Sequence, residues 1–207
     1  MAEFQLYVPI LKQVEGGYQN LAADPGNYNS LGQRVGTNYG ISARFYEDII
    51  KRPPTVQDMK NLTLTRALQI YKVHFWDKIQ GDLIHNQSIA NIIADHAVNA
   101  GVGTISRMVQ NVLNKDFNIN LVVDGKIGNI TVNFINTVNQ QSLFNLIKKA
   151  RENHYRSIGG VFLNVWLNRL KSFAFDLSEK KKEIAIGSLI LFSGLTAFLI
   201  KKYLIKK

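Results

Sequence analysis

The sequence of 207 residues contains no cysteine. Disulfide bonds, thiol nucleophiles and cysteine-ligated metal sites are therefore excluded. Its four histidines show no ligand spacing, so no metal ion is expected. The body also lacks a basic stripe interleaved with aromatic residues, and no nucleic-acid partner is expected. The first twelve residues lack a basic segment followed by an apolar one, so we expect no cleaved secretory signal.

Positive charge is abundant and unevenly distributed along the chain. The formal net charge is +10, and the last fifth of the chain, from Lys171 onward, holds eight lysines against three acidic residues. A dense basic tail suits a polyanionic surface such as phospholipid or cell wall. It would also suit nucleic acid, but the body of the chain offers that interpretation no support.

A long uncharged run lies near the C-terminus. Residues 184–200 contain no charged side chain and have lysines on both sides. As a helix the run would be about 25 Å long, slightly short of a ~30 Å hydrocarbon core, and flanking lysines can snorkel. A buried core helix is the alternative. We predict a transmembrane helix over 184–204 and localisation as a single-pass membrane protein.

The rest of the chain shows the spacing of apolar residues that is typical of amphipathic helices. Residues 3–15 are expected to form one helix, which Gly16 and Gly17 end. A stretch rich in Gly, Asn, Pro and Ser follows and predicts a loop. Thr63 is expected to cap a later helix, and Gly101 to end another. The expected fold is mainly α, with a division into 1–102 and 103–178.

The loop begins and ends with residues that suit glycoside hydrolysis. A glutamate in the last turn of a helix, such as Glu15, feels the negative end of the macrodipole, which disfavours ionisation. A carboxylic acid kept protonated can donate a proton to a leaving oxygen. Asp24 could orient or deprotonate a water molecule, assisted by the Thr37 hydroxyl. On spacing alone, the alternative is that Glu15 is a solvated residue at a helix end.

Several motifs carry a resemblance to a known family. Glu-Gly-Gly-Tyr at 15–18, Asp-Pro-Gly at 24–26 and Thr37 before Gly40-Ile41 resemble the opening of the N-acetylmuramidases of glycoside hydrolase family 108. Later segments resemble the same family in the expected order: 71–82, 95–101, 123–131 and 162–170. The resemblance implies a lysozyme-like helical domain followed by a small helical peptidoglycan-binding unit.

The resemblance also implies an activity and its residues. Glu15 would be the general acid, Asp24 the base and Thr37 its helper, in cleavage of the β-1,4 bond from N-acetylmuramic acid to N-acetylglucosamine. Peptidoglycan would be the partner, and no cofactor is needed. Twelve residues separate Asp24 from Thr37, more than the family has, which suggests an insertion. The alternative is a non-enzymatic, membrane-anchored protein that binds peptidoglycan or assists secretion.

Four further residues are candidates for contacts with substrate. Tyr18 and Tyr39 offer flat faces on which sugar rings could stack, although such aromatic residues are more often in the core. Asp95 and Asn99 lie one turn apart on a predicted helix and could bind sugar by hydrogen bonds. They could equally tie helices together.

The side of the membrane that the catalytic domain faces does not follow from charge. Four lysines precede the uncharged run of residues 184–200 and four follow it. Since no signal precedes the domain, we expect it to be cytoplasmic until release or export.

Overall fold

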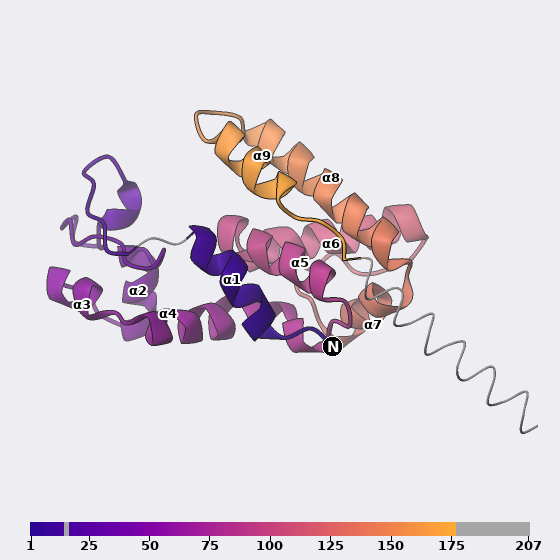
Figure 1. Cartoon of the computed structure of the whole chain (residues 1–207), viewed down its shortest axis with the longest axis horizontal. Helices are drawn as coiled ribbons and strands as arrows, with labels where there is room; N and C mark the ends of the chain where they lie inside the picture. Colours follow the sequence, from indigo (N-terminus) through magenta and orange to yellow (C-terminus); the bar gives the residue numbers. More distant parts are fainter. Residues whose placement is uncertain (15–16, 177–207) are drawn as a thin grey trace, which may run out of the picture.

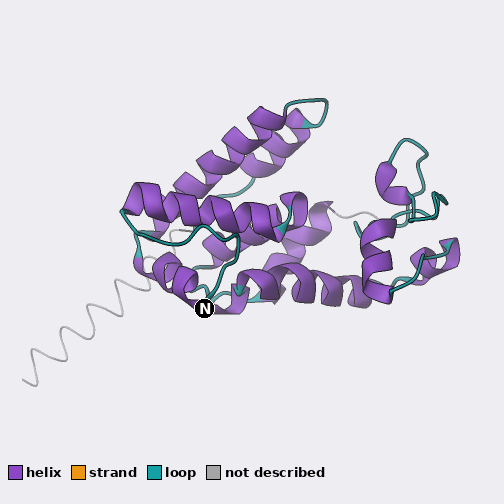
Figure 2. Ribbon diagram, turned by 180° about the vertical axis from the view of Figure 1, so that it is seen from behind, coloured by secondary structure: helices purple, strands orange, loops and turns teal. Residues whose placement is uncertain are grey.

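The structure is a computed structural model that describes residues 1–14 and 17–176. Within these ranges the chain is helical, and its only β-structure is three isolated bridges (Figure 2). The mainly helical prediction is therefore confirmed. The α-helices are α1 Phe4–Val14, α2 Ala43–Ile50, α3 Val56–Asn61, α4 Leu64–Tyr71, α5 Gln87–Ala100, α6 Val102–Phe117, α7 Asn129–Thr137, α8 Gln140–Ile158 and α9 Leu163–Lys171. The short turns are η1 Pro25–Asn27, η2 Lys72–Trp76, η3 Asp77–Ile79 and η4 Gly81–Leu83.

Polar side chains fix where several of these helices begin. Thr63 accepts a hydrogen bond from the N–H of Arg66 at the start of α4, which confirms the predicted cap. Thr55 and Asp58 form a reciprocal capping box on α3. Gly101 ends α5 with a φ of 88°, a conformation that glycine adopts without a steric penalty.

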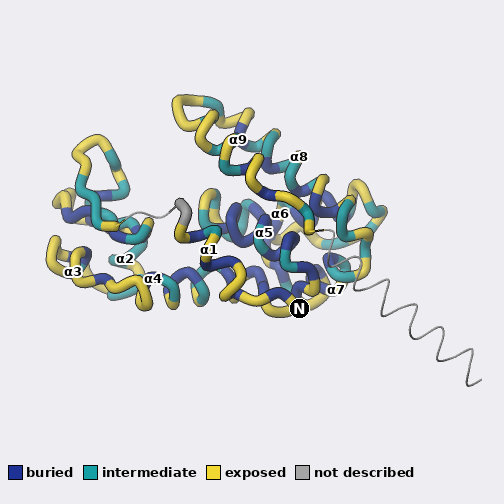
Figure 3. Tube along the Cα trace, in the orientation of Figure 1, coloured by how far each residue is buried: buried dark blue, intermediate teal, exposed yellow. Residues whose placement is uncertain are grey.

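Helix α5 is the centre of the hydrophobic core (Figure 3). Ile89, Ile92 and Ile93 are fully buried, and the small side chains of Ala90, Ala94 and Ala97 are buried as well. Helices α1, α6 and α8 all pack against it. In Figure 1, α1 and α4 lie below and to the left of α5, and α8 and α9 lie above it. Helices that precede α5 in the chain and helices that follow it thus pack against the same helix.

An aromatic cluster fixes α1 against the turns that follow α4. The Trp76 ring stacks on Tyr7 with 5.9 Å between ring centroids, and Phe4 meets it edge-on at 5.7 Å. The Trp76 indole N–H donates to Asp82 at 2.7 Å. A Cβ at Gly81 would lie 2.3 Å from the indole, so only glycine allows this approach. Trp76 is fully buried and belongs to the core.

The predicted division at 102/103 falls in the first turn of α6, just after Gly101 separates α6 from α5. One cluster of buried side chains nevertheless extends from Ala2 to Phe173, and α5 contacts both α6 and α8. Because the cores of the two segments are continuous, packing does not separate them. The two-unit division therefore stays a prediction about the origin and role of the segments.

The prediction of a transmembrane helix is corrected. Across residues 1–14 and 17–176, no helix combines the length and the apolar character needed to cross a membrane. The longest described helix, α8, has 19 residues and carries charged side chains along its length, including Lys148, Arg151 and Arg156. The predicted span 184–204 lies outside the described residues. On this finding the fold with a transmembrane helix and the single-pass localisation are wrong.

Candidate active site

The loop from Gly17 to Ser42 is held in shape by short backbone pairings. Gln19 and Thr37 form an antiparallel bridge in which each N–H donates to the other's carbonyl at 2.9 Å. Tyr28 pairs with Arg34 in a second bridge. The segment between Asp24 and Thr37 is predicted to contain an insertion. The bridge between Gln19 and Thr37 brings the two ends of residues 19–37, which include this segment, side by side, so that they form a closed loop.

Asp24 is held in one orientation at the start of η1. One carboxylate oxygen accepts from the N–H of Gly26 at 2.8 Å, and the other accepts from the Gln19 side-chain amide at 2.5 Å. The Gln19 amide oxygen in turn accepts from the side chain of Asn27, which is fully buried. Because both oxygens are engaged, the half-buried carboxylate cannot rotate freely.

Gly26 brings Asp24 and Thr37 together. A Cβ added to Gly26 would lie 3.1 Å from a carboxylate oxygen of Asp24 and 3.6 Å from the Thr37 hydroxyl oxygen. The two predicted site residues therefore border the same small space, beside Ser42. The Thr37 hydroxyl is buried and has no hydrogen-bond partner among the described residues. A buried hydroxyl without a partner is costly, and a water molecule or ligand hydrogen-bonded to it would remove that cost.

Glu15 and Gly16 lie outside the described residues. The described chain stops at Val14, the last residue of α1, and resumes at Gly17. The predicted role of Glu15 as general acid therefore stays a prediction.

Tyr18 and Tyr39 take different positions. Tyr18 is half-buried: its hydroxyl donates to the Val35 carbonyl at 3.1 Å, and Lys60 lies over its ring. A Cβ at Gly36 would lie 2.5 Å from this ring, so Gly36 is needed for the contact. Tyr39 is also half-buried, with a φ of 48°, and its carbonyl accepts from the Tyr71 hydroxyl. Stacking of sugar on either ring stays a prediction.

The structure places Asp95 away from solvent. It is fully buried, with one oxygen 2.6 Å from Arg151 of α8 and the other 2.5 Å from Arg169 of α9. Arg151 is also fully buried and donates to the Ile92 carbonyl. This geometry favours the alternative in which Asp95 ties helices together. Asn99 is exposed, and its amide lies 3.5 Å from the Tyr155 hydroxyl.

Tyr155 links this cluster to a buried histidine. Its hydroxyl accepts from Arg151 at 2.8 Å and lies 3.1 Å from Nδ1 of His96. Because the hydroxyl accepts from Arg151, its own proton is available to Nδ1 of the neutral His96 ring. Burial first, and then the charge of Arg151 and the nearby His154, lower the pKa of His96 to about 3.

The pKa of His96 predicts loss of stability in acid. The unfolded chain takes up a proton below about pH 6.5, whereas the folded chain does not until about pH 3, so stability falls as the pH falls between these values. Between pH 7 and pH 5 the free energy of unfolding should drop by about 2 kcal/mol from this group. Urea titrations at the two pH values measure the drop. His96→Gln should remove most of it, and His85→Gln, at an exposed position, should not; equal drops in both variants would contradict the assignment.

Sequence reasoning missed the residues that orient Asp24 and Asp95. Gln19 had a local signal, because an amide five residues before an Asp-Pro-Gly turn can reach forward to the Asp of that turn. Arg151 and Arg169 had none, since they are 56 and 74 residues from Asp95. Within the described residues no group of three or more acidic or histidine side chains could hold a metal ion.

Comparisons with known proteins match the region that contains this loop. The family model described as Glycosyl hydrolase 108 matches residues 8–101. No curated protein matches the sequence. Among solved structures, that of Brucella abortus SagA is 26% identical with a TM-score of 0.68, and the match covers 81% of this chain and 89% of that chain. The family match and the shared fold indicate that the protein is a glycoside hydrolase that acts on peptidoglycan.

Proposed function

We propose that the protein is an N-acetylmuramidase, which cleaves the β-1,4 bond from N-acetylmuramic acid to N-acetylglucosamine. The observation that carries the proposal is the fixed carboxylate of Asp24 beside the Thr37 hydroxyl, in a loop that follows Glu15 in the chain. Asp24 and Thr37 lie inside the segment matched by the glycosyl hydrolase family.

Each side chain has a role that suits its surroundings. Glu15 protonates the glycosidic oxygen as the bond breaks. Asp24, held by Gln19 and Gly26, accepts a proton from the attacking water, which its fixed orientation helps to place. The Thr37 hydroxyl, which lacks a partner among the described residues, supplies a further hydrogen bond to that water. Attack by water on the face opposite the leaving group inverts the anomeric carbon.

The segment 103–178 is proposed to hold the enzyme on the wall. Supporting this role, the Asp124-Gly125 turn is rigid: Asp124 accepts from Gln110 and from the Lys126 N–H, and Gly125 donates to Gln110. These hydrogen bonds also hold the pKa of Asp124 below its usual value. The turn therefore keeps one shape in the free protein.

The identity of the bond can be tested by the products. Purified sacculi are digested with the full-length protein, reduced with borohydride and analysed by mass spectrometry. A muramidase leaves the new reducing end on N-acetylmuramic acid, so muramitol should be the reduced sugar. Glucosaminitol as the main reduced sugar would contradict the proposal, while still agreeing with glycoside hydrolysis. Digestion of sacculi by a known muramidase provides the reference.

A further inference from the structure

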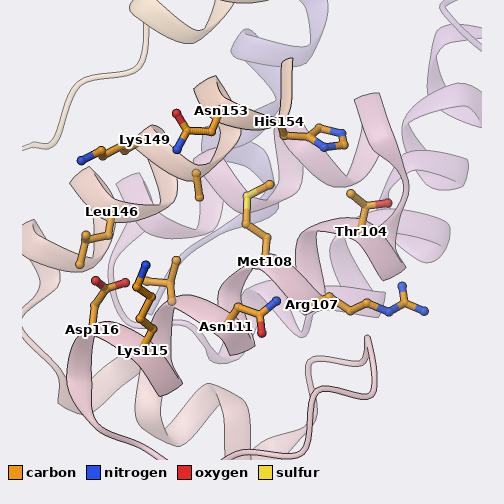
Figure 4. Close-up of a pocket in the computed structure, with 12 residues that line it drawn as sticks. Thr104, Arg107, Met108, Asn111, Lys115, Asp116, Leu146, Lys149, Asn153 and His154 are labelled. Carbon is orange, nitrogen blue, oxygen red and sulfur yellow. The ribbon is translucent and has the colours of Figure 1, made fainter. Parts of the chain in front are cut away.

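A groove runs along the surface between α6 and α8, outside the segment matched by the glycosyl hydrolase family (Figure 4). Its volume is about 590 Å³, within the range of ligand sites. The lining residues of α6 recur every three or four positions from Thr104 to Asp116, and those of α8 do the same from Leu146 to His154. The groove is therefore formed by one face of each helix.

The walls of this groove carry more positive than negative charge. Arg107 and Lys115 come from α6 and Lys149 from α8, against a single carboxylate, Asp116. Among the described residues, none of these four side chains forms an ion pair. Figure 4 shows Lys115 pointing toward α8, with Arg107 at the other end of the groove. Cations from both walls are thus available to an anionic ligand.

Arg107, an exposed residue, lies beside the backbone of two glycines. A Cβ at Gly125 would lie 3.0 Å from its guanidinium carbon, and one at Gly103 would lie 3.1 Å from Nη1. The guanidinium therefore lies close to the start of α6 and to the Asp124-Gly125 turn.

The remaining lining suits a peptide. Met108, Leu146 and Ala150 supply an apolar floor, and methionine adapts to irregular shapes. Asn111 and Asn153 supply amides that can both donate to and accept from peptide bonds. No phenylalanine, tyrosine or tryptophan is among the described residues that line the groove, which disfavours the stacking of successive nucleic-acid bases.

We propose that this groove binds the peptide stems of peptidoglycan through their carboxylates. The proposal rests on peptidoglycan being the substrate, and it gives the segment 103–178 a defined ligand. Stem peptides carry several carboxylates on a short, partly apolar chain, which matches cationic walls over an apolar floor. A stem bound here tethers the wall to the enzyme independently of the sugar in the catalytic loop.

The test is a titration of the full-length protein with a soluble stem tetrapeptide, followed by calorimetry or NMR. The double variant Lys115→Gln/Lys149→Gln should bind about fivefold or more weakly, since each exposed charge pair contributes a modest free energy. The double variant Lys78→Gln/Lys171→Gln removes the same charge from exposed positions outside the groove and should bind as the unmodified protein does. A tetrapeptide with amidated carboxylates should bind weakly to all three proteins.

Three results would overturn the proposal. They are undiminished binding by the Lys115/Lys149 variant, equal binding of the amidated peptide, and groove-dependent binding of an oligonucleotide in place of the peptide. The tetrapeptide contains no glycosidic bond, so the outcome does not depend on the role of Glu15. Failure of the groove and failure of the muramidase assignment are therefore separate results.

Discussion

Glu15→Gln should reduce hydrolysis of cell walls by more than about 10²-fold. Glutamine keeps the shape of the side chain but has no acidic proton to give to the glycosidic oxygen. Because the loss concerns proton donation, kcat should fall while binding of sacculi is retained. Release of soluble reducing sugar from purified sacculi measures the rate, and sedimentation with sacculi measures the binding.

Glu3→Gln is the matched control for this variant. It removes the same charge from an exposed residue just before the other end of α1, and it should hydrolyse walls at the unmodified rate. If Glu15→Gln kept most of the activity, another residue would have to donate the proton, and the mechanism proposed for the loop would be wrong.

Asp95→Asn should lower the free energy of unfolding by about 3–5 kcal/mol, because the variant leaves the buried Arg151 guanidinium without its carboxylate. Arg169, which is partly exposed, would lose the same partner. Urea titration at pH 7 measures the change. The loss is large relative to the 5–15 kcal/mol that typically stabilises a folded protein.

Asp48→Asn is the control for this second variant, since Asp48 is exposed and a substitution there should change stability by less than about 0.5 kcal/mol. Comparing Asp95→Asn with Asp48→Asn also separates the two interpretations of Asp95, sugar binding and an ion pair between helices. A role in sugar binding predicts a raised KM with near-normal stability, whereas the ion-pair cluster predicts the reverse.

Local features of the fold could be predicted from the sequence. The spacing of apolar residues indicated α1 and α5, and Thr63 and Gly101 marked helix ends that the structure confirms. The Asp24-Pro25-Gly26 turn lies in the predicted loop, and the Asp24 side chain bonds the backbone two residues later, as Asp does in such turns. These features depend on residues close together in the chain.

Contacts between distant residues could not be predicted in the same way. Asp95 and Asn99 looked alike on a helical wheel, yet one is fully buried and the other is exposed. The difference arises from α8 and α9, which cover one position and not the other, and a helical pattern does not reveal which helices meet. The transmembrane prediction used the length of an uncharged run and its flanking lysines, which describe a segment without its contacts to the rest of the chain.

The contact of Arg151 with the Ile92 carbonyl and with Asp95 makes α5 and α8 interdependent. Separating the two helices would expose a guanidinium, a carboxylate and a broad apolar face together, so the parts of the chain before and after Gly101 are expected to unfold in one cooperative transition. For evolution and for engineering, this excludes simple exchange of modules: a different wall-binding segment could replace α6 to α9 only if it also supplied a cation and an apolar surface to α5.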